Sequence, residues 1–183
     1  MKKILMTIFA AVAAVSVNAQ VYLGGSFAFE AWSSQKLAGD KSETVFAIMP
    51  EIGYNLNDNL AIGTVIGYQS NKFNGLTSVN GKSETAFFVN PYVRYTFANM
   101  GKVNMFVDSG VEFVSATKTD WTQLGVGFKP GLAISLTDNL SFVSHLGFIG
   151  WKQNNPDGDD NNTSMFGIDL SGADLSFGLY YNF

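Results

Sequence analysis

The chain has no cysteine, one histidine and four prolines, and these shortages exclude several kinds of structure and chemistry. Without cysteine there are no disulfides and no thiolate nucleophiles or metal ligands. A single histidine, His145, leaves little material for histidine-rich metal or catalytic sites. Lysine and arginine total 11 against 15 aspartates and glutamates. No basic cluster is present, so no nucleic-acid partner is expected.

Long apolar runs are absent beyond the first residues. Residues 1–19 are typical of a cleaved signal peptide, with Lys2 and Lys3 before an apolar stretch and a small-residue site ending at Ala19. Residues 20–183 then form one domain. None of its apolar runs approaches the roughly 20 residues of a membrane helix. Within a membrane, such a domain must be a closed β-barrel, because only helices and closed barrels satisfy their backbone groups there.

Alternation of side-chain character is the main feature that is present. At the C-terminus, Leu175, Phe177, Leu179, Tyr181 and Phe183 share one parity, and polar or small residues occupy the other. Because successive side chains of a strand point to opposite faces, this segment has one apolar face. Eight such strands are predicted, at 21–32, 44–56, 60–70, 85–97, 103–114, 122–136, 140–151 and 173–183.

The connections between these strands alternate in length. Short polar turns lie at 57–59, 98–102 and 137–139, and longer polar segments at 33–43, 71–84, 115–121 and 152–169. Apolar outward faces and alternating connections are typical of outer-membrane barrels, with short turns in the periplasm. The predicted fold is therefore an all-β, eight-stranded, antiparallel, up-and-down transmembrane β-barrel.

Three prolines argue against this assignment, because proline cannot donate to a strand ladder. Pro50, Pro91 and Pro130 occupy similar depths in the second, fourth and sixth predicted strands. We interpret them as a shared local bulge or kink. Pro50 and Pro130 each begin one copy of an internal sequence repeat, in which residues 50–60 parallel residues 130–140.

Charged residues fall on the inward parity of several strands. An eight-stranded barrel is just wide enough for its side chains to fill, and buried charges must be paired. A structural ion-pair network is therefore favoured over acid–base catalysis. We expect Arg94 to lie diagonal to Asp108, with Glu51 as second partner. The predicted network comprises Glu30, Glu51, Arg94, Asp108, Glu112, Lys129, His145 and Asp174.

No catalytic, metal or cofactor-binding residues are predicted. His145 is expected to be a hydrogen-bonded interior residue, although a hydrolytic role for it stays an alternative. The acidic segment 157–161 resembles part of a calcium loop, but it lacks the glycine and the terminal glutamate that an EF-hand needs. A divalent ion there is the less favoured alternative to a solvated loop.

Aromatic residues gather near both ends of the predicted strands, as expected of rings that prefer headgroup depth. Strict alternation points the three tryptophans into the barrel mouth, but one bulge would reverse any of them. A tryptophan-lined mouth could bind a ligand; a rim girdle is the favoured interpretation. The predicted aromatic rim comprises Trp32, Trp121, Trp151, Tyr54 and Tyr95.

The chain resembles the small OmpX/OmpA-type outer-membrane β-barrel domains of the porin-like group found in Bacteroidetes-type bacteria. The resemblance rests on the Ala19-Gln20 junction, the Asp-Asn-Leu turns, and the segments 50–54, 91–95 and 179–183. It implies that Leu179, Tyr181 and Phe183 form the signal read by the barrel-assembly machinery. It also implies a location in the cell outer membrane, among membrane lipid and lipopolysaccharide.

These features favour a non-enzymatic, envelope-structural or surface-interaction role, with an extracellular ligand possible at the long loops. A small-solute channel is the main alternative, although large residues such as Tyr92, Phe106 and Tyr180 face inward. A lipid-modifying barrel enzyme is less favoured, because the single histidine lies away from the rim. A secreted lipocalin-like barrel would need the reverse pattern of apolar and polar faces.

Overall fold

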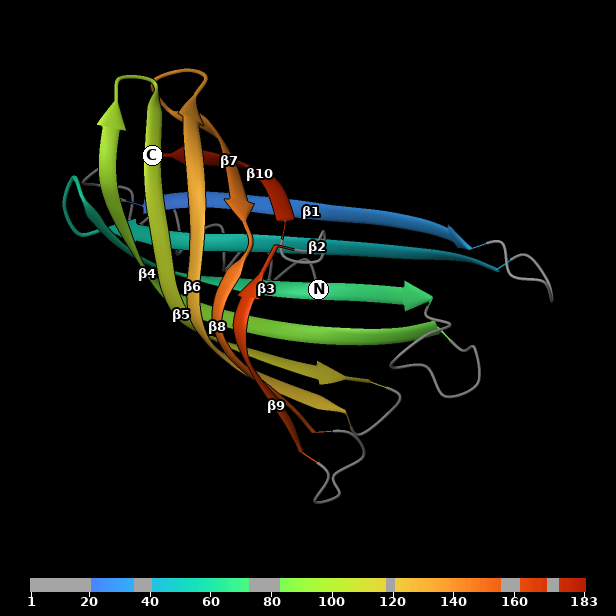
Figure 1. The fold of residues 1–183 in the computed structure, drawn as a ribbon. Helices are drawn as coiled ribbons and strands as arrows, with labels where there is room; N and C mark the ends of the chain where they lie inside the picture. Colours follow the sequence, from blue (N-terminus) through green and yellow to red (C-terminus); the bar gives the residue numbers. More distant parts are fainter. Residues whose placement is uncertain (1–20, 35–40, 73–82, 118–120, 156–161, 171–174) are drawn as a thin grey trace, which may run out of the picture.

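The described part of the protein consists of antiparallel β-strands and the short turns between them (Figure 1). The computed structural model describes residues 21–34, 41–72, 83–117, 121–155, 162–170 and 175–183. Within these ranges, no helix has the length and apolar character needed to cross a membrane. The strands are β1 (Val21–Ser34), β2 (Lys41–Asn55), β3 (Leu60–Lys72), β4 (Ser83–Met100), β5 (Val103–Ala116), β6 (Thr122–Ser135), β7 (Leu140–Leu146), β8 (Phe148–Asn155), β9 (Thr163–Asp169) and β10 (Leu175–Asn182).

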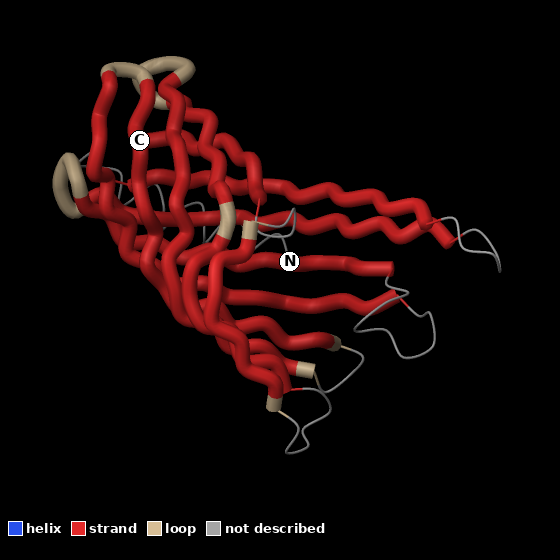
Figure 2. Tube along the Cα trace, viewed as in Figure 1, coloured by secondary structure: helices blue, strands red, loops and turns tan. Residues whose placement is uncertain are grey.

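Eight of these strands close into a ring, which confirms the predicted barrel. Each strand from β1 to β6 pairs with the one that follows it, up to β7. β7 in turn pairs with β10, which pairs with β1. The closing β1–β10 ladder runs from Tyr22 opposite Asn182 to Phe27 opposite Phe177. A backbone bond of 3.0 Å from Phe183 N to Val21 O completes it. The continuous strand tubes in Figure 2 follow this ring at the end that carries the turns.

The predicted seventh strand is broken, and the predicted loop at 152–169 is partly a hairpin. Gly147, at a φ of 139°, separates β7 from β8. β7 pairs with β6 from Gly131 onward, whereas β8 pairs with the part of β6 from Thr122 to Phe128. β8 then forms a hairpin with β9, and β9 pairs with no other strand among the described residues. The expectation of loop throughout 152–169 is therefore wrong.

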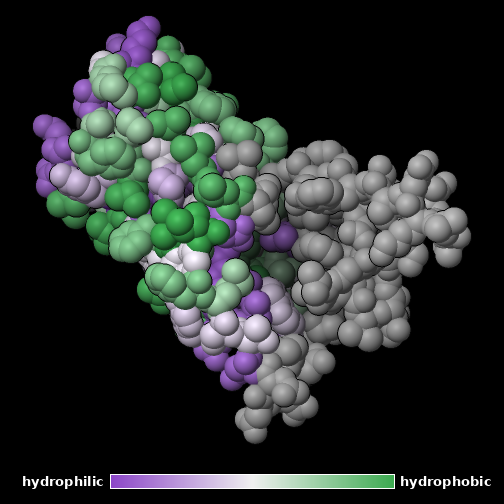
Figure 3. Space-filling view, viewed as in Figure 1, coloured by the Kyte–Doolittle hydropathy of each residue, from purple (hydrophilic) through white to green (hydrophobic). Residues whose placement is uncertain are grey.

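The ring has an apolar outer wall and a filled interior, as alternation predicts. Phe87, Val93, Phe128 and Leu179 are exposed on the outside, whereas Tyr92 and Tyr180, each next to one of them in the chain, are buried. Figure 3 shows the resulting broad apolar zone on the visible wall, with hydrophilic residues at the turn ends. This outside-apolar arrangement matches a barrel whose solvent is lipid.

Each strand proline interrupts the ladder on one side only. Pro50, Pro91 and Pro130 pair with the preceding strands at Gly25, Thr64 and Val107. Toward the following strand, the ladder has no rung at any of the three prolines. The missing proline N–H therefore faces the side where pairing is absent.

Two of the turns use the same side-chain cap. The Asn57 Oδ1 accepts from the backbone N–H of Leu60 at 2.9 Å, and the Thr137 Oγ1 accepts from that of Leu140 at 3.0 Å. Short polar side chains that bond backbone groups two or three residues onward favour tight turns. The repeated Asp-Asn-Leu segments thus mark equivalent ends of the barrel.

Candidate functional site

A bidentate ion pair lies at the centre of the lumen. Arg94 from β4 donates from Nε to Asp108 Oδ1 and from Nη2 to Asp108 Oδ2, both at 2.7 Å. The two residues are directly opposite in the β4–β5 ladder. The diagonal register predicted from the sequence is wrong, because β4 continues to Met100, which pairs with Val103 across a turn of two residues rather than the expected turn at 98–102. A bulge between Thr96 and Ala98 then shifts the pairing by one residue, which brings Arg94 opposite Asp108. Fork-to-carboxylate geometry of this kind is the strongest form of the arginine–carboxylate contact.

Glu51 from β2 joins the pair from across the lumen. Its Oε1 lies 3.4 Å from Arg94 Nη2. It also accepts hydrogen bonds from the hydroxyls of Tyr92 and Tyr180, and the Tyr92 hydroxyl bonds that of Tyr22. Buried carboxylates are stable when donors satisfy their oxygens. Tyr92 and Tyr180 therefore satisfy the Glu51 oxygens, because one arginine cannot satisfy two carboxylates alone.

His145 connects the ion pair to the last strand. Its Nε2 lies 2.8 Å from Asp108 Oδ2, and its Nδ1 lies 3.2 Å from the Ser176 hydroxyl. The fold thus brings a serine, a histidine and an aspartate into one hydrogen-bonded chain, as in hydrolases. Here, however, Asp108 is shared with Arg94, and the histidine ring packs edge-on against Phe106 at 5.4 Å. Ser176 was not among the residues predicted from the sequence.

Aromatic rings surround the Arg94 guanidinium. The Arg94 Cζ lies 4.0 Å from the Phe106 ring centroid, and between 5.1 and 5.8 Å from the rings of Tyr92, Tyr180 and Tyr22. Cations are attracted to ring faces at such distances. Among the described residues, Phe106 is the largest fully buried side chain, at 1% exposure. The guanidinium is thus held by charge, hydrogen bonds and ring faces together.

The cluster forms a layer to which every strand of the ring contributes. Arg94, Asp108, Glu51 and His145 supply the polar groups. Apolar packing comes from the remaining strands, including Ala61 of β3 and Ala133 of β6. We name this set the lumen layer; its members are Tyr22, Glu51, Ala61, Tyr92, Arg94, Phe106, Asp108, Ala133, Val143, His145 and Tyr180.

Glycines opposite the large rings make room for the lumen layer. Tyr22 lies opposite Gly53, and Tyr180 opposite Gly24, in the strand ladders. A Cβ at Gly53 would fall 2.1 Å from the Tyr22 ring, and one at Gly24 would fall 2.4 Å from the Tyr180 ring. A side chain at either glycine would displace a ring. Inward glycines that face aromatics are the sequence signal from which these ring positions could have been predicted.

Two further ion pairs lie along the inner wall, farther from the turns. Lys129 Nζ bonds Glu112 Oε2, and Lys152 Nζ lies 3.8 Å from Asp169 Oδ2. Lys152 also lies over the Phe148 ring, 4.4 Å from its centroid. Lys152 and Asp169 were not predicted to face inward, because their segment was expected to be a loop.

Some predicted site residues fall outside the described part. Asp174 and the acidic segment 157–161 lie beyond the described residues, as do the side chains of Glu30 and Trp32. Within the described residues, no group of three or more His, Cys, Asp or Glu side chains could hold a metal ion. The predicted signal peptide, residues 1–19, and its predicted cleavage site also lie outside the described residues.

The structure describes the side chains of four of the five residues of the predicted aromatic rim. Tyr95 and Tyr181 are exposed on the outer wall near the turns, and Tyr54 and Trp121 are half-buried. Trp151 shares its rung with Val126 and Phe166, which face outward. The extra residue at Gly147 reverses parity, so Phe148 is buried inside and Trp151 faces out. Strict alternation, which pointed Phe148 outward and Trp151 inward, is wrong beyond that glycine.

The comparisons with known proteins agree with this architecture. The sequence model of the outer membrane protein beta-barrel domain family matches residues 4–183. The chain belongs to this family. Its fold is similar to that of Neisserial surface protein A, NspA, with a TM-score of 0.52 and 18% identity over 89% of this chain and 97% of that one. It is also similar to the outer membrane protein OprG from Pseudomonas aeruginosa, with a TM-score of 0.53 and 12% identity over 90% and 96%.

No curated protein matches the chain in a sequence search. At identities of 18% and 12% the two structural likenesses support the fold alone. The role of this barrel must therefore be argued from its own lumen and surface.

Proposed function

We propose that this protein is an integral outer-membrane barrel with a closed lumen, and that it acts non-enzymatically through its surface. The lumen layer is the observation that carries this proposal. Its charges are paired with one another, the hydroxyls of Tyr92 and Tyr180 bond Glu51, and the Phe106 ring is fully buried among them. A solute path would have to break these contacts, because eight-stranded barrels leave no space beyond their own side chains.

Planar-bilayer recording tests the closed lumen. The purified full-length protein is expected to show no discrete conductance steps. The double variant Tyr22→Ala/Phe106→Ala removes two rings from the layer and is expected to produce steps, which shows that the assay detects an opened barrel. The matched variant Tyr181→Ala removes a ring from the outer wall and should stay silent. Regular steps from the wild-type protein would contradict the proposal in favour of a channel.

The hydrogen-bonded chain of Ser176, His145 and Asp108 is the one feature among the described residues that would favour a lipid-modifying enzyme. Its histidine and aspartate are buried in the same layer as Arg94, and Asp108 already has two bonds to that arginine. We propose that the chain is structural. Lipid A from cells that express wild-type protein or Ser176→Ala should give identical mass spectra. A mass change that depends on Ser176 would overturn the non-enzymatic assignment.

A further inference from the structure

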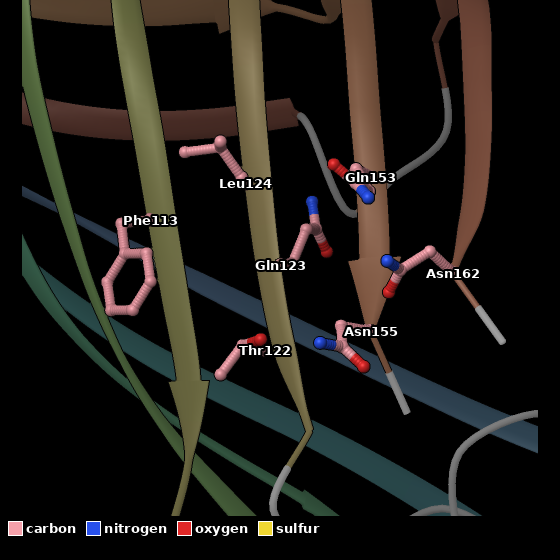
Figure 4. Close-up of a pocket in the computed structure, with 7 residues that line it drawn as sticks. All are labelled: Phe113, Thr122, Gln123, Leu124, Gln153, Asn155 and Asn162. Atoms are coloured by element: carbon pink, nitrogen blue, oxygen red, sulfur yellow. The ribbon is translucent and has the colours of Figure 1, made fainter. Parts of the chain in front are cut away.

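A small pocket lies on the wall formed by β5, β6 and β8, at the end opposite the short turns (Figure 4). Its volume is about 150 Å³, well below the roughly 300–1,000 Å³ of sites for drug-sized ligands. It therefore suits a single ring or a comparable group. Its lining residues are Phe113, Thr122, Gln123, Leu124, Gln153, Asn155 and Asn162.

Most of this lining faces outward. Phe113 and Leu124 are exposed and lie on one rung with Gln153. Thr122 lies opposite Asn155 on the next rung toward the strand ends. Residues on one rung of a ladder share a face of the sheet. The pocket therefore opens outside the barrel and is separate from the lumen layer.

The pocket lies at the border between the apolar wall and its polar rim. One rung below Gln153, about 7 Å along the strand, Trp151 and Phe166 face outward beside Val126. Above that aromatic rung, the outward residues of β8 are amides. Aromatic rings prefer headgroup depth in a membrane, so the pocket lies at the level of the headgroups or just beyond them.

The lining has the chemistry of a neutral, hydroxyl-rich ligand. Its four amides and one hydroxyl can each donate and accept hydrogen bonds. None of its seven residues is charged, whereas phosphates favour arginine and lysine and hard cations favour carboxylates. Phe113 and Leu124 supply an apolar side for the C–H face of a ring. Figure 4 shows Gln123 and Asn155 between β6 and β8, Gln153 on β8 and Asn162 beyond it, with Phe113 and Leu124 on the side of β5.

One polar atom of the lining lacks a partner. The Asn155 Oδ1 is buried and accepts no hydrogen bond from any residue that the structure describes. Buried acceptors without partners are uncommon, because leaving one unsatisfied is costly. A donor from a bound ligand would satisfy this oxygen.

We propose that the outward pocket at Gln153 and Asn155 binds a neutral sugar ring. The ring belongs either to a free saccharide or to the sugar headgroup of an outer-leaflet glycolipid. This inference rests on the proposed function, since it supplies the ligand of the surface role. Sugar binding at this pocket does not depend on whether the lumen conducts. A conducting wild type would contradict the closed lumen alone, and a lack of sugar binding would contradict this inference alone.

The test compares the wild type with three full-length variants in detergent micelles and in nanodiscs. Gln153→Ala/Asn155→Ala removes two outward amides. Asn154→Ala is the matched control, because it removes the same kind of side chain from the inward face of the same strand. Gln153→Glu/Asn155→Asp keeps the shape and removes the amide donors, which covers a failure of the alanine variant to fold.

Free sugar is probed by saturation-transfer NMR with a panel of neutral hexoses, N-acetylhexosamines and their disaccharides. The proposal expects a panel member to bind wild type and Asn154→Ala equally, and about tenfold more weakly to both double variants. Bound glycolipid is probed by comparing unfolding temperatures in lipopolysaccharide-containing and phospholipid-only nanodiscs. A lipopolysaccharide-dependent rise in wild type and Asn154→Ala that both double variants lose, without binding of free sugar, identifies the headgroup as the source. Absence of both effects, or equal loss in Asn154→Ala, would overturn the proposal.

Discussion

At the scale of single residues, Arg94 is the side chain on which most of the interactions in the lumen layer converge. It makes two bonds to Asp108, approaches Glu51 and lies over the Phe106 ring. Its removal leaves two carboxylates without their main counter-charge. Tyr92 already bonds Glu51, and His145 already bonds Asp108. These hydrogen bonds are present with Arg94 in place, so they add nothing new to compensate for the lost charge.

We expect Arg94→Leu to lower the free energy of unfolding by about 3–5 kcal/mol, because it leaves buried carboxylates unpaired. Arg94→Leu/Asp108→Leu should cost clearly less than the two single changes summed. Urea titration of the folded barrel in detergent micelles measures both effects. Lys102→Leu, at an exposed turn position, is the control and should stay within about 0.5 kcal/mol of wild type. If the loss of unfolding free energy in the double variant equalled the sum of the two single losses, the contact between Arg94 and Asp108 would contribute no coupling energy.

The partners of Arg94 could be predicted from the sequence only in part. Parity placed Arg94, Asp108 and Glu51 on one face, and the need to pair buried charges made them partners. The direct opposition of Arg94 and Asp108 depends on the position of the two-residue turn after Met100 and on the bulge beside Phe97. No residue type in that segment announces a bulge. The bonds from Tyr22, Tyr92 and Tyr180 also depend on where the rings lean, which alternation does not specify.

At the scale of elements, Gly147 decides how the seventh predicted strand continues. Its φ of 139° is a conformation that side chains disfavour. A Cβ there would also lie 2.5 Å from the Asp169 carbonyl oxygen. The inserted residue turns Phe148 inward and Trp151 outward. This reversal could not be located from the sequence, because a glycine inside an alternating strand does not show its φ.

We expect Gly147→Ala to destabilise the barrel by roughly 1–3 kcal/mol, because it adds a strained conformation and a backbone clash. Gly167→Ala is the matched control in the facing strand, where nothing lies within 4 Å of the added Cβ. The control should change stability by no more than about 0.5 kcal/mol. Urea titration compares the two variants. Equal stabilities would mean that β7 and β8 are joined differently from the arrangement seen here.

The outer face of the strands should reject charge according to depth. Phe128 and Leu146 are exposed on the wall away from both ends. We expect arginine at either position to cost about 2–4 kcal/mol in a bilayer, because the side chain must leave water at mid-membrane. Met100→Arg, at the turn end of β4, should cost about 0–1 kcal/mol. Equilibrium folding into lipid vesicles measures the series. Equal tolerance at all three positions would contradict a lipid-facing wall.

At the scale of the whole molecule, the ring was predictable and its outer end was not. Alternation with period two runs through most of the ring, because one face meets the lumen layer and the other the apolar surroundings. It is interrupted at the bulge of β4 and in β7, where Val143, Ser144 and His145 are all buried. Beyond Gly147 the chain forms the β8–β9 hairpin, and β9 pairs with β8 alone among the described strands. In β9, Phe166 is 82% exposed. Because the residues of β9 are exposed or only half-buried, its sequence need not alternate between apolar and polar residues. Polar composition led us to expect only loop in that region.

Assembly of the whole barrel gives the final prediction, which concerns Phe183. Its backbone N–H bonds Val21 O at 3.0 Å, and its ring packs edge-on against Tyr181 at 5.0 Å. Deleting Phe183 removes one hydrogen bond at the seam, worth about 1 kcal/mol, so folding into detergent micelles should stay largely intact. In cells, we expect outer-membrane insertion to fall, because the C-terminal aromatic is the expected signal for the assembly machinery. Phe177→Ala removes a ring from the same outward row and should insert normally. Surface labelling of intact cells compares the three proteins, and equal surface levels after the deletion would show that the terminal residue carries no assembly signal.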